Sequence, residues 1–153
     1  MRRKKDEKSR GPRDASALRA GVVVARFHTD ITGAMEKGAL ATLKKWRIPE
    51  RNIKIAHTYG SFELPLVASR LVKRHKLDLV VAIGCIIKGE TRHDEYLAHA
   101  TSYGLMRLSL ERNVAVGFGV ITANDLKQAR TRSRGGSNKG SEAALAALEA
   151  ALS

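Results

Sequence analysis

IGCIIKGETRHDEY, residues 83–96, is an apolar segment that breaks at Gly89 and leads through four polar residues into a predicted helix start. Two other apolar segments, residues 21–27 and 52–60, also run directly into polar side chains. In an open parallel sheet, ligands bind outside the carboxyl ends of the strands, because loops there carry polar groups while the strands stay buried. We therefore expect three strand ends to converge on one edge of a sheet and to form a site there.

The fold class follows from the segments around these strand ends. Apolar, β-branched runs alternate with segments of helical period, and the predicted strands are residues 21–27, 52–58, 78–87 and 115–122. Strands that alternate with helices specify right-handed crossovers and a parallel sheet covered on both faces. The sequence therefore predicts a flavodoxin-like, three-layer α/β/α sandwich with a four-stranded parallel sheet.

A helix is predicted after each strand. Asp30 is expected to cap a helix that reaches Trp46. A second helix begins near Phe62, because Pro65 is tolerated only in a first turn. The remaining helices are predicted over residues 93–112, in a short piece opened by Asn124 or Asp125, and over residues 141–152. The helix residues expected in the core are Met35, Leu40, Leu43, Leu66, Val67, Leu71, Val72, Leu97, Tyr103, Leu105, Met106 and Leu108.

Composition narrows the class of protein. With 153 residues and 43% hydrophobic content, the chain can bury one core, so one domain is expected. Its single cysteine, Cys85, excludes an intrachain disulfide framework, and its place in an apolar run predicts a small core residue instead of an activated thiol. The longest uncharged apolar run, residues 79–87, is too short to cross a bilayer, and no secretory leader is apparent. We expect a cytoplasmic protein with no membrane partner.

The formal net charge of +13 is shared between a tail and a body. Residues 1–19 hold eight Lys or Arg and three Asp or Glu, which gives 8 − 3 = +5, and residues 20–153 carry 20 − 12 = +8. We predict a disordered basic tail over residues 1–19 and one domain over residues 20–153. Such a tail can hold RNA through counterion release, although it is more often a solubilising extension. The basic body equally suits a phosphorylated substrate.

A glycine-rich loop near the end of the chain, RGGSNKGS at residues 134–141, suits an anion. It lacks the GxxxxGK[ST] spacing of nucleotide-hydrolysing enzymes, so that class is a poor match. A flexible connection explains its glycines but not its cations. The candidate phosphate ligands here are Arg130, Arg132, Arg134 and Lys139.

The five histidines do not indicate a metal centre, because neither an HExxH motif nor paired cysteines are present. His93 differs from the others because it follows a strand end, next to Thr91, where an imidazole can give and take protons near neutral pH. His57, His75 and His99 fit a strand, a helix end and a helix surface.

A set of side chains at the predicted strand ends and loops has a common chemical logic. Aromatic rings can stack on a flat heterocycle, a carboxylate can bind hydroxyls, and threonine with arginine can hold a phosphate. No nucleophile and base of the hydrolase kind occur among them, which favours a condensation. The set is Phe27, Phe62, Glu63, Thr91, His93, Phe118 and Arg132.

In the order of its motifs the chain resembles the lumazine synthase family, which makes 6,7-dimethyl-8-ribityllumazine in riboflavin biosynthesis. The motifs are VVVARF at residues 22–27, GSFELP at 60–65, IGCIIKGETRHDEY at 83–96, GFGVIT at 117–122, QARTR at 128–132 and NKGSEAALAALE at 138–149. The resemblance covers the chain from Gly21 onward, and the long central motif is the specific part.

The resemblance implies an enzyme that joins 5-amino-6-(D-ribitylamino)uracil to 3,4-dihydroxy-2-butanone 4-phosphate without a metal or organic cofactor. It implies one proton donor and acceptor, His93, and eleven substrate-binding residues: Phe27, Ser61, Phe62, Glu63, Cys85, Ile86, Ile87, Glu90, Thr91, Phe118 and Arg132. Phe27 would stack on the pyrimidine, the residues at 85–87 would offer backbone hydrogen bonds, and Glu90 and Thr91 would meet the phosphate.

The resemblance also implies a homo-oligomer. Phe118 and Arg132 would reach the site from a neighbouring subunit, in a pentamer that many family members close into an icosahedral shell. A functional association with riboflavin synthase is a further implied partner, whereas nucleic acid is not expected. The rival reading is a catalytically idle shell or scaffold homologue that holds RNA through the basic tail. Joint retention of the substrate-binding and proton-transfer residues argues against it, since a scaffold needs none of them.

Overall fold

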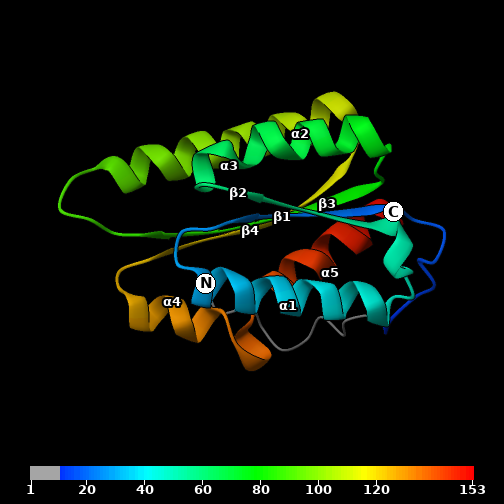
Figure 1. The fold of residues 1–153 in the computed structure, drawn as a ribbon, viewed down its shortest axis with the longest axis horizontal. Helices are drawn as coiled ribbons and strands as arrows, with labels where there is room; N and C mark the ends of the chain where they lie inside the picture. The colour runs from blue at the N-terminus through cyan, green and yellow to red at the C-terminus, as the bar shows by residue number, and fades with distance from the viewer. Residues whose placement is uncertain (1–10) are drawn as a thin grey trace.

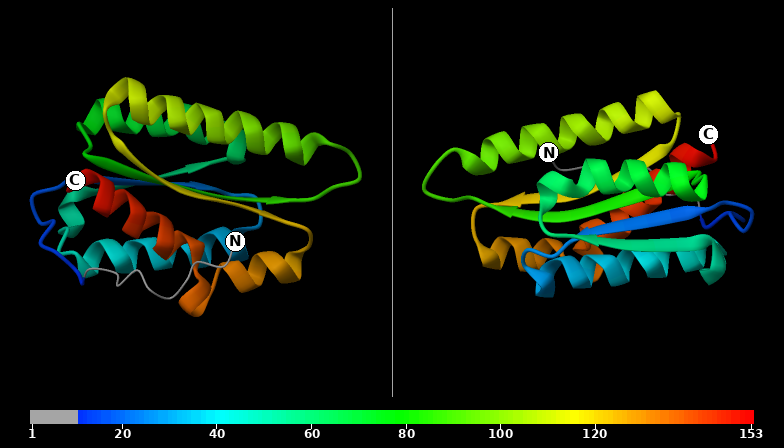
Figure 2. Two further views of the ribbon diagram at one scale, coloured as in Figure 1. Left: turned by 180° about the vertical axis from the view of Figure 1, so that it is seen from behind. Right: turned by 45° about the horizontal axis from the view of Figure 1, so that its top comes forward.

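The computed structural model describes residues 11–153, and within them four parallel strands form a sheet (Figure 1). The strands are β1 (Ala20–Ala25), β2 (Ile53–Thr58), β3 (Leu79–Ile87) and β4 (Ala115–Ala123), in the order β2-β1-β3-β4. Helices α2 (Leu64–His75) and α3 (His93–Arg112) cover one face, and α1 (Thr29–Lys45), α4 (Leu126–Arg132) and α5 (Lys139–Ala151) cover the other, which both views of Figure 2 also show. The prediction of a three-layer α/β/α sandwich with a four-stranded parallel sheet is confirmed.

The helices lie close to their predicted positions. They are α1 (Thr29–Lys45), α2 (Leu64–His75), α3 (His93–Arg112), α4 (Leu126–Arg132) and α5 (Lys139–Ala151), with 3-10 turns η1 (Glu50–Asn52), η2 (Ser61–Glu63) and η3 (Gly135–Ser137). Pro65 lies in the first turn of α2, and the Asp125 side chain caps α4 by accepting a hydrogen bond from the Gln128 backbone N–H. No helix among the described residues is long and apolar enough to cross a membrane.

The order of the strands determines where a ligand can bind. From β1 the chain moves outward to β2, then returns through α2 to β3 on the other side of β1 and continues outward to β4. The direction of winding therefore reverses between β1 and β3, and open α/β sheets bind ligands at the carboxyl ends beside such a reversal. The pairing of β1 with β3 ends at Val24 and Ile83, whereas β3 continues to Ile87 beside β4. This longer β3 leaves room beyond the end of β1.

Each face of the sheet has its own apolar core. Val22, Val24 and Ile83 belong to the cluster beneath α1 and α5, whereas Val23 and Val80 belong to the cluster beneath α2 and α3. Successive residues of a strand point to opposite faces, so β3, buried along almost its whole length, is apolar at nearly every position. This burial holds the strand ends, and the loops that follow them, in fixed positions.

Several side-chain predictions are wrong. Asp30 does not cap α1: the N-cap is His28, in a left-handed conformation with φ 57°, and Asp30 in the first turn pairs instead with Arg130 at 3.4 Å. Tyr103 and Met106, expected in the core, are 65% and 59% exposed. Leu66 is also exposed, whereas the other predicted core residues are buried or pack against the core.

The part of the predicted tail that the structure describes contacts the body. The Arg13 guanidinium pairs with the Glu149 carboxylate at 2.7 Å and lies 5.6 Å from the centroid of the Trp46 ring. Ala15 is buried, and its backbone N–H donates to the Trp46 carbonyl at 2.9 Å. The predicted disorder of residues 1–10 lies outside the described residues, and the domain boundary at residue 20 stays a prediction.

Candidate active site

A cavity of about 800 Å³ opens at the carboxyl ends of β1, β2 and β3. Nine of the twelve predicted site residues line it: Phe27, Ser61, Phe62, Glu63, Cys85, Ile86, Ile87, Thr91 and His93. Its other lining residues are His28, Tyr59, Gly60, Gly89, Asp94, Tyr96, Leu97 and Ala100. The three strand ends therefore converge as the sequence predicts, and they do so beside the reversal of winding between β1 and β3.

Two aromatic rings stand at the mouth of the cavity. Phe27 follows β1 and is half exposed, and its ring meets the Tyr59 ring edge-on, with centroids 5.2 Å apart and planes at 88°. The left-handed His28 turns the chain directly from Phe27 into α1. Because half of the Phe27 side chain is exposed, its ring can stack on a flat heterocycle.

The turn after β2 is held by its own hydrogen bonds. The Thr58 hydroxyl donates to the Gly60 carbonyl at 2.7 Å, and the Glu63 carboxylate accepts from the Gly60 backbone N–H at 2.9 Å. The buried Ser61 lies so close to β3 that a Cβ at Gly84 would stand 2.5 Å from the Ser61 hydroxyl oxygen. The turn is therefore anchored, while the Phe62 ring stays 65% exposed.

The last residues of β3 present backbone along one wall of the cavity. Cys85, Ile86 and Ile87 pair with β4 on one side, but the described part of β1 has no partner for them, because its pairing ends at Ile83. A backbone edge without a strand partner can hydrogen-bond to the edge of a heterocycle.

The Cys85 side chain lies at the same place. Burial first, and the nearby Asp30 charge second, raise the pKa of the Cys85 thiol to about 11. Cys85 is buried in the core cluster beneath α1 and α5, so its prediction as a small core residue is confirmed.

The turn from β3 to α3 brings Thr91 and His93 to the cavity. His93 is the first residue of α3, its side chain is exposed, and its backbone N–H donates to the Thr91 hydroxyl at 3.3 Å. The first backbone N–H groups of a helix have no partner within the helix, and together with the helix dipole they favour an anion nearby. An imidazole and a helix start that favours anions thus lie together at the cavity.

The other three predicted site residues lie apart from the cavity. Glu90 is exposed on the turn and does not line it. Phe118 is half exposed on β4, on the same face as Val116 and Val120, which pack beneath α2 and α3. Arg132 lines a separate hollow of about 510 Å³ with Gln128, Thr131, Gly136, Ser137, Lys139 and Glu142. In a single chain the site therefore lacks the aromatic lid and the arginine that the resemblance implies.

The four candidate phosphate cations differ in their partners. Arg130 pairs with Asp30 at 3.4 Å and Lys139 with Glu142 at 2.6 Å. Among residues 11–153, Arg132 and Arg134 form no ion pair, and of these two only Arg132 lines the hollow. Arg132 is thus the best placed of the four to meet a ligand.

Sequence reasoning missed the two tyrosines of the cavity. Tyr59 and Tyr96 both line it, and both stand beside predicted site motifs, Tyr59 before GSFELP and Tyr96 at the end of the central motif. Aromatic residues flanking two converging strand ends were the available signal. No group of three or more His, Cys, Asp or Glu that suits a metal ion occurs among residues 11–153.

Two comparisons with known proteins identify the family of this chain. The family model for 6,7-dimethyl-8-ribityllumazine synthase matches residues 17–153. The chain is 38% identical to the 6,7-dimethyl-8-ribityllumazine synthase of Phocaeicola vulgatus over 137 residues, which cover 89% of this chain and 82% of that protein. The chain therefore belongs to the 6,7-dimethyl-8-ribityllumazine synthase family, the transferases that make lumazine in riboflavin biosynthesis.

Proposed function

We propose that this chain condenses 5-amino-6-(D-ribitylamino)uracil with 3,4-dihydroxy-2-butanone 4-phosphate to 6,7-dimethyl-8-ribityllumazine, releasing phosphate and water. The observation that carries the proposal is the cavity at the carboxyl ends of three strands, where aromatic rings, a free backbone edge and an imidazole face one volume of about 800 Å³. That volume lies within the range of small-molecule sites, which is roughly 300 to 1,000 Å³.

The pyrimidine fits the part of the cavity nearest the sheet. Phe27 offers a ring face, and the residues at 85–87 offer backbone groups that can read the edge of the heterocycle. Phe62 and the second oxygen of Glu63, which is not bonded to Gly60, would contact the ribityl chain. Stacking with edge-on hydrogen bonds would fix the orientation of the ring before the second substrate reacts.

The phosphorylated substrate fits the start of α3. Thr91 and the N-terminal N–H groups of that helix would hold the phosphate, and His93 would move protons between the reacting groups. The amine would attack the ketone and lose water to give an imine, the phosphate would leave, and ring closure would release a second water. Positioning and proton transfer supply most of the acceleration in such a condensation.

Phe118 and Arg132 would complete the site from a neighbouring subunit. Both are accessible in the single chain, and both lie outside the cavity. Exposed apolar side chains on α3, among them Tyr103, Met106 and Leu110, supply a surface that association would bury. We propose a cytoplasmic pentamer, or a multiple of pentamers, with each site shared by two subunits.

Turnover with the two substrates, followed by lumazine absorbance, tests the activity and separates it from an idle scaffold. Mixing tests the sharing of the site. An assembly formed from equal amounts of the His93→Ala and Arg132→Ala variants should regain about one active site in four. A site is intact only where a subunit that keeps His93 adjoins a subunit that keeps Arg132, and random assembly across a heterologous interface gives each a chance of about one half. If the mixture is no more active than the separate variants, the two residues do not serve the same shared site.

A further inference from the structure

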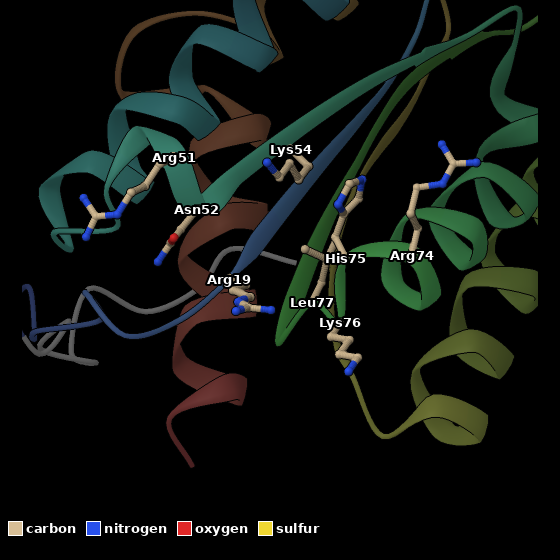
Figure 3. Close-up of a pocket in the computed structure, with 8 residues that line it drawn as sticks. All are labelled: Arg19, Arg51, Asn52, Lys54, Arg74, His75, Lys76 and Leu77. Carbon is tan, nitrogen blue, oxygen red and sulfur yellow. The ribbon is translucent and has the colours of Figure 1, made fainter.

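A second hollow, of about 420 Å³, opens at the amino end of the sheet, opposite the candidate active site (Figure 3). Its lining residues come from the segment before β1, from η1, from β2 and from the end of α2: Arg19, Arg51, Asn52, Lys54, Arg74, His75, Lys76 and Leu77. Strand β3 separates it from the active-site cavity by nine residues, roughly 30 Å of strand. The two volumes therefore do not share residues.

The hollow holds five permanently positive side chains and no carboxylate. Some cations elsewhere have acidic partners, such as Glu149 for Arg13, Glu111 for Arg107 and Asp30 for Arg130, whereas others, such as Arg132 and Arg134, form no ion pair among residues 11–153. Among residues 11–153, none of the five cations of the hollow forms an ion pair. A concave surface lined by one sign of charge concentrates its electric field and attracts ions of the opposite sign.

The helix dipole explains only part of this cluster. Arg74 lies in the last turn of α2 and Lys76 caps its end, where cations are favoured in any helix. Arg19, Arg51 and Lys54 lie in other segments, so the end of α2 does not account for their presence around the same hollow. Figure 3 shows Arg51 and Arg74 on opposite sides of it, with Arg19 and Lys76 between them.

The backbone that carries these cations is fixed. The Arg19 backbone N–H donates to the Asp78 carboxylate at 2.8 Å, and the Arg19 carbonyl accepts from the Asp78 N–H, also at 2.8 Å. The Asn52 side chain donates to the Leu18 carbonyl at 3.3 Å, which joins the start of β2 to the segment before β1. Two acids adjoin lining residues in sequence: Asp78 is thus occupied by backbone, and Glu50, which is exposed in η1, does not line the hollow.

We propose that this hollow binds an oligophosphate anion, a small ligand whose negative charge is spread over more than one phosphate group. Cations on opposite sides of the hollow match a ligand with several charged groups better than a single point charge. Arginine and lysine both bind phosphate, arginine through paired donors. Five of the eight lining residues are cations and one, His75, carries an aromatic ring, so charge dominates the lining and the phosphates are the groups that the hollow recognises.

The test is titration of tripolyphosphate into the intact protein by calorimetry, at low and at physiological salt. The informative variant is Arg19→Gln with Lys54→Gln. The matched control is Lys37→Gln with Lys127→Gln, which removes the same charge from exposed positions on α1 and α4 that do not line the hollow. A third variant, Arg132→Ala, reports any binding of the probe at the candidate active site. Thermal unfolding of each variant shows that it is folded.

We expect the Arg19 and Lys54 variant to bind tripolyphosphate at least about tenfold more weakly, as the loss of charge-assisted hydrogen bonds implies. The control pair and the Arg132 variant should bind as the unmodified protein does, and turnover should be unchanged in the Arg19 and Lys54 variant. Equal weakening by both pairs would mean diffuse attraction to a basic surface and would overturn the proposal. So would loss of binding in the Arg132 variant alone, absence of binding at physiological salt, or binding of single-stranded RNA but not of tripolyphosphate.

Discussion

The Glu63 carboxylate accepts a hydrogen bond from the Gly60 backbone N–H at 2.9 Å, so the acid that faces the cavity also closes the turn between β2 and α2. One oxygen of the carboxylate is used by the fold, and the other is available to a substrate hydroxyl. The structural and the binding role of this side chain can be separated, because glutamine keeps an acceptor oxygen for Gly60 but loses the charge.

Replacement of Glu63 should affect stability and binding differently. For Glu63→Gln we expect stability close to that of the unmodified protein, whereas Glu63→Ala should lose about 1 kcal/mol, the usual net contribution of one hydrogen bond. Both variants should bind the ribitylaminouracil more weakly. Denaturant unfolding and equilibrium binding measure the two effects. Unchanged affinity in the glutamine variant would mean that the charge has no role in binding.

His93→Ala should slow the reaction by about 10² to 10⁴, the usual contribution of general acid-base assistance, without abolishing it. The substitution keeps the backbone N–H that donates to the Thr91 hydroxyl, so the turn before α3 should persist. Lumazine absorbance gives the rate, and solution mass gives the assembly. An oligomer that dissociates on this change would show that the exposed imidazole holds the subunits together.

Arg132→Ala should impair use of the butanone phosphate far more than binding of the ribitylaminouracil. A charge-assisted contact to phosphate contributes roughly 1.5 to 3 kcal/mol, about ten- to a hundredfold in an equilibrium constant. Arg134→Ala is the matched control, because Arg134 also has no ion pair among residues 11–153 but does not line the hollow of Arg132. Equal losses for both substrates in the Arg132 variant would assign it a structural role.

Much of the fold was predictable because it depends on local pattern. The four strands are found within about two residues of the predicted bounds, since β-branched apolar runs that alternate with helical segments leave few other arrangements. The convergence of residues 27, 61–63, 85–87, 91 and 93 on one cavity followed from the same alternation, because parallel strands place all their carboxyl ends at one edge.

Side-chain partners were not predictable because they depend on contacts between distant segments. Asp30 has the sequence position of a helix cap, but Arg130, a hundred residues away, pairs with it, and the left-handed His28 starts the helix instead. The spacing of Tyr103 and Met106 fits an apolar helix face, yet the sheet covers only the face with Leu105 and Leu108. A helical period does not say whether a second apolar stripe packs within the chain or against another subunit.

The Cys85 thiol should make stability depend on pH above about 9. Its pKa is raised from 9.0 to about 11, chiefly by burial. The unfolded chain therefore releases this proton before the folded chain does, so the contribution to stability is full below pH 9 and is lost as pH rises towards 11. Cys85→Ala should lack this loss. The measurement is the free energy of unfolding of both proteins at pH 8 and pH 10.5. Lysines and tyrosines titrate in the same range in both proteins, so their contributions cancel when the two pH dependences are subtracted. Parallel pH dependence of the two proteins would contradict the shift.

Gly140→Ala should be strongly destabilising, although alanine is the better helix former. Gly140 lies in the first turn of α5, where its N–H donates to the Asn138 side chain at 2.9 Å, and a Cβ there would stand 2.0 Å from the Met35 carbonyl oxygen in α1. The clash is with backbone and cannot be relieved by rotating a side chain. Overpacking of this kind costs about 1 to 3 kcal/mol or more, which exceeds the gain in helix propensity of about 1 kcal/mol.

Gly136→Ala is the matched control, because a Cβ there meets nothing within 4 Å, so its stability should change by no more than about 0.5 kcal/mol. Denaturant midpoints measure both changes. The Asn138 side chain, which caps α5, also donates a hydrogen bond to the Ala34 carbonyl of α1 at 3.0 Å. Helix α5 therefore cannot move away from α1 to make room for the methyl group without disturbing its own cap. An unchanged midpoint for Gly140→Ala would show that α5 does not approach α1 this closely.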